Sequence, residues 1–118
     1  TRVRSSAASD VYKRQELDII QASPLVFAEP PAGRYPCLEL ALRAGRAGRT
    51  YPAVLCGADE VAVELFLSGR IRFTAIPRLI EEVLDRHVPG DERDLAAVLA
   101  ADEWAREECH RQSVLGNA

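Results

Sequence analysis

A chain of 118 residues with 47% hydrophobic and 28% charged side chains has the composition of one small globular domain. Its formal net charge of −3 argues against a nucleic-acid partner, and it contains no apolar run long enough for a membrane-spanning helix. The three cysteines, Cys37, Cys56 and Cys109, are widely spaced, which fits reduced cytosolic thiols better than a disulfide framework.

The first fifteen residues differ in composition from the rest. Lys13 is the only lysine, whereas residues 16–118 carry eleven arginines. Residues 5–15 agree, codon by codon, with the in-frame translation of a transposon adapter used in sequencing libraries. This likeness, in a chain without methionine, predicts that residues 1–15 are a non-native, disordered leader that packs against nothing. The alternative interpretation is a basic arm or a targeting peptide.

The chain expected to be authentic begins mid-protein, near Glu16. It has 11 basic and 17 acidic side chains, a net charge of −6. Residues 16–34 are predicted to form a connector, because short apolar runs at 17–20 and 25–28 are typical of brief extended segments. These are expected to be edge strands or a stretch that lies on another part of the protein. A cluster of proline and glycine at 29–33 marks its boundary.

From residue 35 onward the apolar spacing is helical. A first helix is expected to begin near Pro36. A second is expected to be capped by Thr50 and to end before Gly69, and a third to be capped by Thr74. Each has an apolar stripe that predicts its core face. These positions are Leu38, Ala41, Leu42 and Gly45, then Val54, Ala58, Val61, Ala62 and Leu65, then Ile76, Leu79, Ile80, Val83 and Leu84.

The C-terminal part is predicted to hold one or two further helices. Residues 91–100 would form a short helix that uses Leu95, Val98 and Leu99 for the core. Asp102 would then cap a final segment that carries Ala105 and Cys109. Four or five amphipathic helices joined by short loops predict a mainly α fold, a small bundle over residues 35–118 with an extended connector on its N-terminal side.

Few residues suggest a metal-binding, cofactor-binding or catalytic role. Residues 107–110, Glu-Glu-Cys-His, contain a Glu-x-x-His spacing, and two such pairs on facing helices can hold a di-iron centre. Only one copy is present, so a solvated helix face is the preferred interpretation. Cys37, Cys56 and Cys109 include no Cys-x-x-Cys pair for zinc and are interpreted as small core residues. The chain also has no glycine-rich phosphate loop between a strand and a helix.

Other polar or aromatic candidates have plain structural interpretations. Asp59, Glu60 and Glu64 form an acidic patch, interpreted as a solvated face because no histidine or lysine accompanies it. Trp104 is expected to pack at the edge of the bundle rather than stack on a ligand. His87 ends the third helix, where an imidazolium would complement the helix dipole, and is not expected to be a catalytic base. The sequence therefore predicts no catalytic, cofactor-binding or metal-binding residue in this chain.

Nevertheless, the order of motifs along residues 17–108 is distinctive. It resembles the connector and C-terminal helical domain of the 1-deoxy-D-xylulose 5-phosphate reductoisomerase family. The motifs that carry this likeness are Leu17-Asp18, Leu25-x-Phe27, Arg34-Tyr35-Pro36-Cys37-Leu38-x-Leu40-Ala41, Pro52-Ala53-Val54-Leu55, Glu60-Val61-Ala62-Val63, Phe66-Leu67, Ile71-Arg72-Phe73-x-x-Ile76, Ile80-Glu81-x-x-Leu84 and Val98-Leu99-Ala100-Ala101-Asp102-x-x-Ala105-Arg106.

One departure from the family pattern concerns residues 56–60. The family's usual Asn-Ala-Ala-Asn-Glu is here Cys-Gly-Ala-Asp-Glu. Gly57 within a helix costs about 1 kcal/mol relative to alanine. Asp59 replaces an amide by a carboxylate, which removes a hydrogen-bond donor and adds a charge. We therefore expect local packing around this segment to differ from that of the family.

The resemblance implies an enzyme of the methylerythritol phosphate route to isoprenoids. Such enzymes convert 1-deoxy-D-xylulose 5-phosphate to 2-C-methyl-D-erythritol 4-phosphate with NADPH and a divalent metal, Mg or Mn. In that family the nucleotide-binding domain, the metal carboxylates and the substrate-binding residues all precede the part matched here. The chain is therefore expected to be inactive alone, and its parent to be a cytoplasmic bacterial homodimer. The alternative is a free-standing helical interaction module.

The resemblance also implies which part of the protein the connector contacts. In the family it runs between the catalytic domain and the bundle, and that catalytic domain is expected to be missing from this chain. One face of the connector would then be uncovered, and exposed apolar patches favour association. We expect aggregation or non-native dimerisation through residues 17–28, while residues 35–112 keep a helical core.

Overall fold

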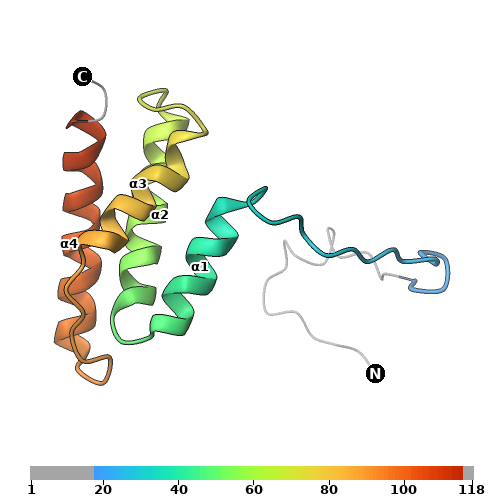
Figure 1. The fold of residues 1–118 in the computed structure, drawn as a ribbon, viewed down its shortest axis with the longest axis horizontal. Helices are drawn as coiled ribbons and strands as arrows, with labels where there is room; N and C mark the ends of the chain where they lie inside the picture. The colour runs from blue at the N-terminus through green and yellow to red at the C-terminus, as the bar shows by residue number, and fades with distance from the viewer. Residues whose placement is uncertain (1–17, 116–118) are drawn as a thin grey trace, which may run out of the picture.

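A computed structural model describes residues 18–115 of the chain. These residues form four helices and contain no strand (Figure 1), which confirms the predicted mainly α bundle. The leader predicted at 1–15 lies outside the described residues. No helix within 18–115 is both long and apolar enough to cross a bilayer. The helices are α1 (Pro36–Ala47), α2 (Tyr51–Leu67), α3 (Ala75–Arg86) and α4 (Leu95–Leu115).

Helix α2 is the centre of the bundle. Helices α1 and α4 both pack against α2 without touching each other, and α3 lies across all three (Figure 1). The core stripes predicted for α2 and α3 are confirmed, because every one of their ten positions is buried. Gly69 follows the end of α2 with a φ of +74°, the left-handed conformation that glycine adopts without strain.

The core stripe predicted for α1 is wrong. Leu40 and Ala44 join the core, whereas Leu38 and Leu42 are 44% and 47% exposed. Residues advance about 100° each around an α-helix, so positions 38 and 42 lie on the side opposite to position 40. The spacing indicated a helix correctly but not which face α2 and α3 cover. Helix α1 therefore presents an apolar outer face.

Helix α4 is continuous, so one C-terminal helix forms of the one or two predicted, and the break expected before Asp102 is wrong. Its first turn is capped by Asp94, whose Oδ1 accepts a hydrogen bond from the backbone N–H of Ala96 at 3.0 Å. Asp102, the expected cap, lies inside the helix and accepts a hydrogen bond from Arg106 Nε at 2.9 Å. The alanine-rich stretch between these aspartates contains no glycine or proline that would end a helix.

Core contacts of α4 come from its later turns. Ala105 and Cys109 are fully buried, as predicted. Leu95 and Leu99, predicted to be core residues, are 71% and 60% exposed, while Val98 is half-buried. The two exposed leucines lie one turn apart and share a face that α2 and α3 do not cover. As in α1, an apolar side of the helix is left without a partner among the described residues.

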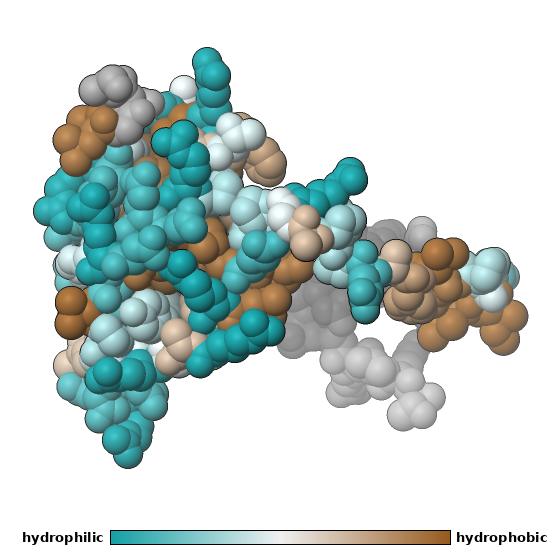
Figure 2. Space-filling model, in the orientation of Figure 1, coloured by the Kyte–Doolittle hydropathy of each residue, from teal (hydrophilic) through white to brown (hydrophobic). Residues whose placement is uncertain are grey.

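The described part of the predicted connector, residues 18–34, runs away from the bundle as irregular chain with turns (Figure 1). Edge strands were one prediction for it, and they do not form. A strand needs a partner with which to share its backbone hydrogen bonds, and the described residues supply none. Apolar side chains are exposed along it (Figure 2). Those between 59% and 88% exposed are Ile19, Ile20, Leu25, Val26 and Phe27.

Candidate functional site

The predicted metal-ligand candidates do not converge. Glu107 and His110 are both on the solvent side of α4, as the solvated-face interpretation requires. Cys109 is buried, but Cys37 and Cys56 are exposed, so their interpretation as core residues is wrong. Cys56 lies between the buried positions of α2, and its side chain consequently points outward. Within residues 18–115, no three His, Cys, Asp or Glu side chains are grouped closely enough to hold a metal ion.

The acidic patch of α2 is solvated, as predicted, and one of its residues, Glu60, links α2 to α4. Glu60 Oε2 accepts a hydrogen bond from Arg106 Nη2 at 2.7 Å, and the same guanidinium contacts Asp102 in α4. Hydrogen bonds first to Asp102 and then to Glu60 raise the pKa of Arg106 above its ordinary value. Because one guanidinium binds carboxylates of both α2 and α4, this group is a structural contact between the two helices rather than a general acid or base.

Gly57 lies where α2 packs directly against α4. A Cβ atom added there would lie 2.8 Å from Asp102 Oδ1 and 2.9 Å from the Asp102 carbonyl oxygen. The departure from the family motif at this position thus has a packing reason. The absence of a side chain lets the two helices approach, which offsets the helix-propensity cost of glycine.

Glu108 is a buried carboxylate that the sequence analysis missed. Its side chain is 1% exposed, and its Oε1 accepts a hydrogen bond from Gln112 Nε2 at 2.6 Å. Arg111 forms an ion pair with it, and Arg86 Nη1 of α3 lies 3.7 Å from its Oε1. Its position three residues after Ala105, on the buried face of α4, was the signal that could have found it. The ion pair with Arg86 links α3 to α4, while Glu108 Oε2 is buried and accepts no hydrogen bond from the described residues.

A polar contact joins the start of α2 to the loop between α3 and α4. Thr50 precedes α2, as predicted, but its side chain makes no capping bond. Its Oγ1 instead lies 2.8 Å from His87 Nε2 and accepts a hydrogen bond from the Gly90 N–H at 2.9 Å. Thr74, the other predicted cap, likewise makes no side-chain capping bond. Thr50 therefore bonds to two residues, His87 and Gly90, that lie 37 and 40 positions further along the chain.

Aromatic rings surround His87. The ring of Tyr51 meets it edge-on at a centroid distance of 5.0 Å, and the Trp104 ring lies at 5.4 Å. Burial lowers the pKa of His87 below its ordinary value, which favours the neutral imidazole over the imidazolium expected from its place at the helix end. Trp104 packs against the core at the edge of the bundle, as predicted.

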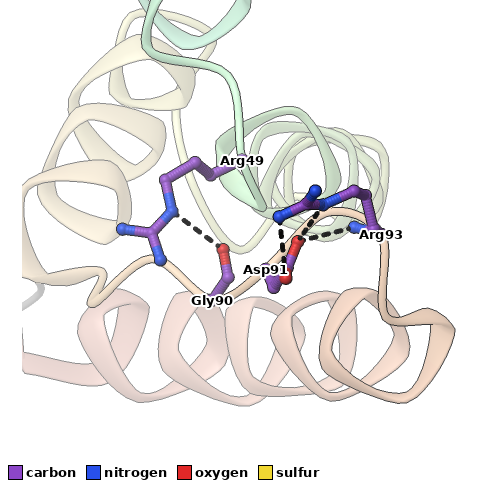
Figure 3. Close-up of polar contacts among 4 residues, drawn as sticks. All are labelled: Arg49, Gly90, Asp91 and Arg93. Carbon is purple, nitrogen blue, oxygen red and sulfur yellow. Dashed lines mark hydrogen bonds and ion pairs between the residues drawn. The ribbon is translucent and has the colours of Figure 1, made fainter.

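The loop that follows His87 has further polar contacts (Figure 3). Arg49 Nε donates a hydrogen bond to the Gly90 carbonyl oxygen at 3.1 Å. Within the loop, the backbone N–H and the Nε of Arg93 both donate to Asp91 Oδ1, at 3.0 and 3.2 Å. These contacts lower the pKa of Asp91. The loop is thus held to the chain before α2 at Gly90, and the contacts between Asp91 and Arg93 stabilise the turn that follows.

The Thr50–His87 pair has the distance of a nucleophile and its base, yet its surroundings do not suit nucleophilic catalysis. The Thr50 side chain is 1% exposed, and its oxygen already accepts the Gly90 N–H. No carboxylate within residues 18–115 hydrogen-bonds to His87 as the orienting third member of a triad would. A cavity of about 320 Å³ adjoins the pair, but Arg86 is its only charged lining residue. The arrangement fits a structural contact.

Comparisons with known proteins agree with the fold and with the motifs. Residues 5–108 match the family model of the DXP reductoisomerase C-terminal domain. The chain is 59% identical over 92 residues to 1-deoxy-D-xylulose 5-phosphate reductoisomerase of Moorella thermoacetica, covering 78% of the chain and 24% of the relative. It is 57% identical over 91 residues to that of Thermomicrobium roseum, covering 76% and 24%.

A solved structure is similar as well. The 1-deoxy-D-xylulose 5-phosphate reductoisomerase from Zymomonas mobilis, in complex with NADPH, matches with a TM-score of 0.76 and 30% identity. That match covers 96% of this chain and 28% of the Zymomonas chain. The chain thus spans about a quarter of the length of the relatives it matches. It belongs to the DXP reductoisomerase C-terminal domain family.

Proposed function

We propose that this chain is the C-terminal helical domain of a cytoplasmic bacterial reductoisomerase that converts 1-deoxy-D-xylulose 5-phosphate to 2-C-methyl-D-erythritol 4-phosphate. Identity of up to 59%, confined to about a quarter of each relative's length, is the observation that carries this proposal. In the same proposal residues 1–15 are a non-native leader, residues 16–34 lead into the bundle, and residues 35–118 form the domain.

The proposed role of the domain is structural. The residues described here do not fit NADPH or a divalent metal, because they form neither a strand–glycine loop–helix unit nor a group of three metal-ligating side chains. We therefore assign both to the remaining domains of the polypeptide, which would supply the hydride donor and the Lewis acid. No residue of this chain is assigned to the chemical step.

The proposed partners are these remaining domains, within a homodimeric enzyme. Two uncovered apolar surfaces suit such a contact. One is the outer face of α1 with Leu38 and Leu42, and the other is the connector segment 25–27, which leads directly toward α1. Contacts of this kind would position the catalytic domain against a rigid support, which matters because catalysis depends on geometry to within about 1 Å.

A chimera tests this proposal. The C-terminal quarter of the Moorella enzyme is replaced by residues 16–118, and NADPH oxidation is followed with 1-deoxy-D-xylulose 5-phosphate and Mg²⁺. The expected result is activity in the chimera and none in the unfused chain or in the truncated enzyme. Leu38→Asp with Leu42→Asp should lower the activity of the chimera, whereas Glu64→Gln, a matched change on an exposed polar position, should not. NADPH oxidation by the unfused chain, above a blank without metal, would overturn the proposal.

A further inference from the structure

We infer that Thr50 and His87 form an acid-sensitive latch, which holds the loop of residues 87–94 against the start of α2 and releases it when His87 takes up a proton. The inference rests on contacts within this chain and does not depend on the proposed function. Its geometric basis is the pair of hydrogen bonds at Thr50 Oγ1, 2.8 Å to His87 Nε2 and 2.9 Å to the Gly90 nitrogen.

The hydrogen-bond inventory assigns the proton positions. The Gly90 N–H can only donate, so Thr50 Oγ1 accepts that bond. The Thr50 hydroxyl is buried, and its own proton then has His87 Nε2 as its acceptor. The imidazole is accordingly neutral, with its hydrogen on Nδ1, a tautomer assigned from the network. Protonation places a second N–H at Nε2, so the buried Thr50 hydroxyl must turn its proton away from the ring and loses His87 as its acceptor, which weakens the contact.

The charged groups near His87 offer no compensation. The charged groups on the elements packed around His87 are Arg49, Asp85, Arg86, Asp91 and Glu108, and the phenol of Tyr51 is a further titratable group there. Each of the three carboxylates already has an arginine partner. Arg49 and Arg86 bring positive charge to the same region. An imidazolium would therefore be partly buried beside the rings of Tyr51 and Trp104, without a free carboxylate among these described groups to offset its desolvation.

The direction of the pH effect follows from linkage. Burial lowers the pKa of His87 in the closed form below the ordinary value of 6.5, which the open form would regain. The open form then binds the proton more tightly, so acid favours opening. The contribution of the latch is complete above pH 6.5 and is lost as the pH falls toward the lowered pKa of the closed form.

Opening has a defined structural consequence. The cavity beside the latch is lined by Thr50, His87 and Gly90 on one side and by Ala97, Ala101 and Trp104 on the other. Withdrawal of the loop removes His87 and Gly90 from this lining and leaves Thr50 in place. Trp104, the only tryptophan of the chain, is partly exposed already, and its ring would become more accessible to water. The N–H of Gly90 would lose its acceptor at the same time.

The latch is tested by amide hydrogen exchange at Gly90 and by Trp104 fluorescence between pH 8 and pH 5. We expect the protection factor of Gly90 to fall as the pH drops below 6.5, by no more than about tenfold per pH unit, with a parallel red shift of the emission. His87→Gln keeps an acceptor for Thr50 but does not titrate, so protection should become independent of pH. His110→Gln, at the other histidine of the chain, should leave the pH dependence intact.

Substitutions at Thr50 provide an independent check. Thr50→Val keeps the shape but removes the hydroxyl, and should abolish Gly90 protection at every pH, whereas Thr50→Ser should restore it. Far-UV circular dichroism establishes that each variant remains folded, and the result for His87→Gln stands if Thr50→Val does not fold. Constant protection from pH 8 to pH 5 in the unaltered chain, or an unchanged decline in His87→Gln, would overturn the inference.

Discussion

The centre of the bundle and the connector are both rich in apolar residues, yet they behave in opposite ways. In α2 and α3 the apolar positions recur on one face of each helix, and all ten of these positions are buried. In residues 18–34 the apolar side chains project into solvent without a periodic face. Apolar content alone therefore does not make a core. It must be arranged on a face, and that face must meet a partner.

Helix α1 and the first turns of α4 lie between these two extremes. Each has a regular apolar stripe, but Leu38, Leu42, Leu95 and Leu99 face away from the other described helices. Periodicity thus determined the helical conformation, whereas burial depended on where the neighbouring helices lie. The contrast between the bundle and the connector can be tested by matched substitutions in both.

The largest effect is expected from truncating a core side chain. Leu65 in α2 is fully buried, so Leu65→Ala should lower the free energy of unfolding by about 3 kcal/mol. Phe27 in the connector is exposed, and Phe27→Ala should change the free energy of unfolding by less than about 0.5 kcal/mol. Urea denaturation followed by circular dichroism measures both. Equal losses would contradict the assignment of the connector to a region outside the core.

Two glycine substitutions should have effects of opposite sign. Gly57→Ala would place its Cβ against Asp102 and should destabilise the bundle by about 1 kcal/mol, because overpacking exceeds the gain in helix propensity. Gly45→Ala in α1 meets no atom within 4 Å and should stabilise it by about 0.5–1 kcal/mol. Thermal unfolding compares the two variants. Stabilisation by Gly57→Ala would show that α2 and α4 do not approach so closely.

Self-association of the chain should depend on the exposed apolar side chains of the connector. Replacing Leu25, Val26 and Phe27 together by serine removes exposed apolar surface and should shift the chain from associated species to monomer in sedimentation velocity. Helix content should stay the same, since these residues lie outside the helices. Leu95→Ser with Leu99→Ser is the matched change on the bundle. If only this second variant becomes monomeric, association occurs through α4 and not through the connector.

The smallest effect is expected at the surface ion pairs between α2 and α4. Arg106→Gln removes the bridge between Glu60 and Asp102 and should lower the melting temperature slightly. Because exposed pairs are screened by salt, the difference from the unaltered chain should shrink in about 1 M NaCl. Differential scanning fluorimetry at low and high salt measures it. A difference that is independent of salt would point to packing rather than charge.

How far the sequence predicts this molecule depends on the range of each interaction. The α2 and α3 cores were predictable because they follow from spacing within one helix. The continuity of α4 was missed because Asp102 was interpreted as a cap, although no helix-breaking residue precedes it. The outward stripe of α1 depends on the neighbouring helices, which the spacing of its own residues does not encode.

The polar contacts were harder to predict than the helices. Thr50 and His87 were each placed correctly at helix ends, but their hydrogen bond spans 37 residues and results only from tertiary packing. The burial of Glu108 follows from its place on the core side of α4, and its charge had suggested solvent instead. In both cases the local pattern identified the element, and the partner on another element determined the role.

We expect the helices to fold as a unit by themselves, whereas the connector needs another part of the polypeptide. Amide hydrogen exchange on a chain shown by sedimentation to be monomeric distinguishes the two regions. Slow exchange is expected in the buried turns of α2, α3 and α4, with fast exchange throughout residues 18–28. Slow exchange across 18–28 in the monomer would mean that the bundle covers the connector unaided, which would favour a free-standing helical module.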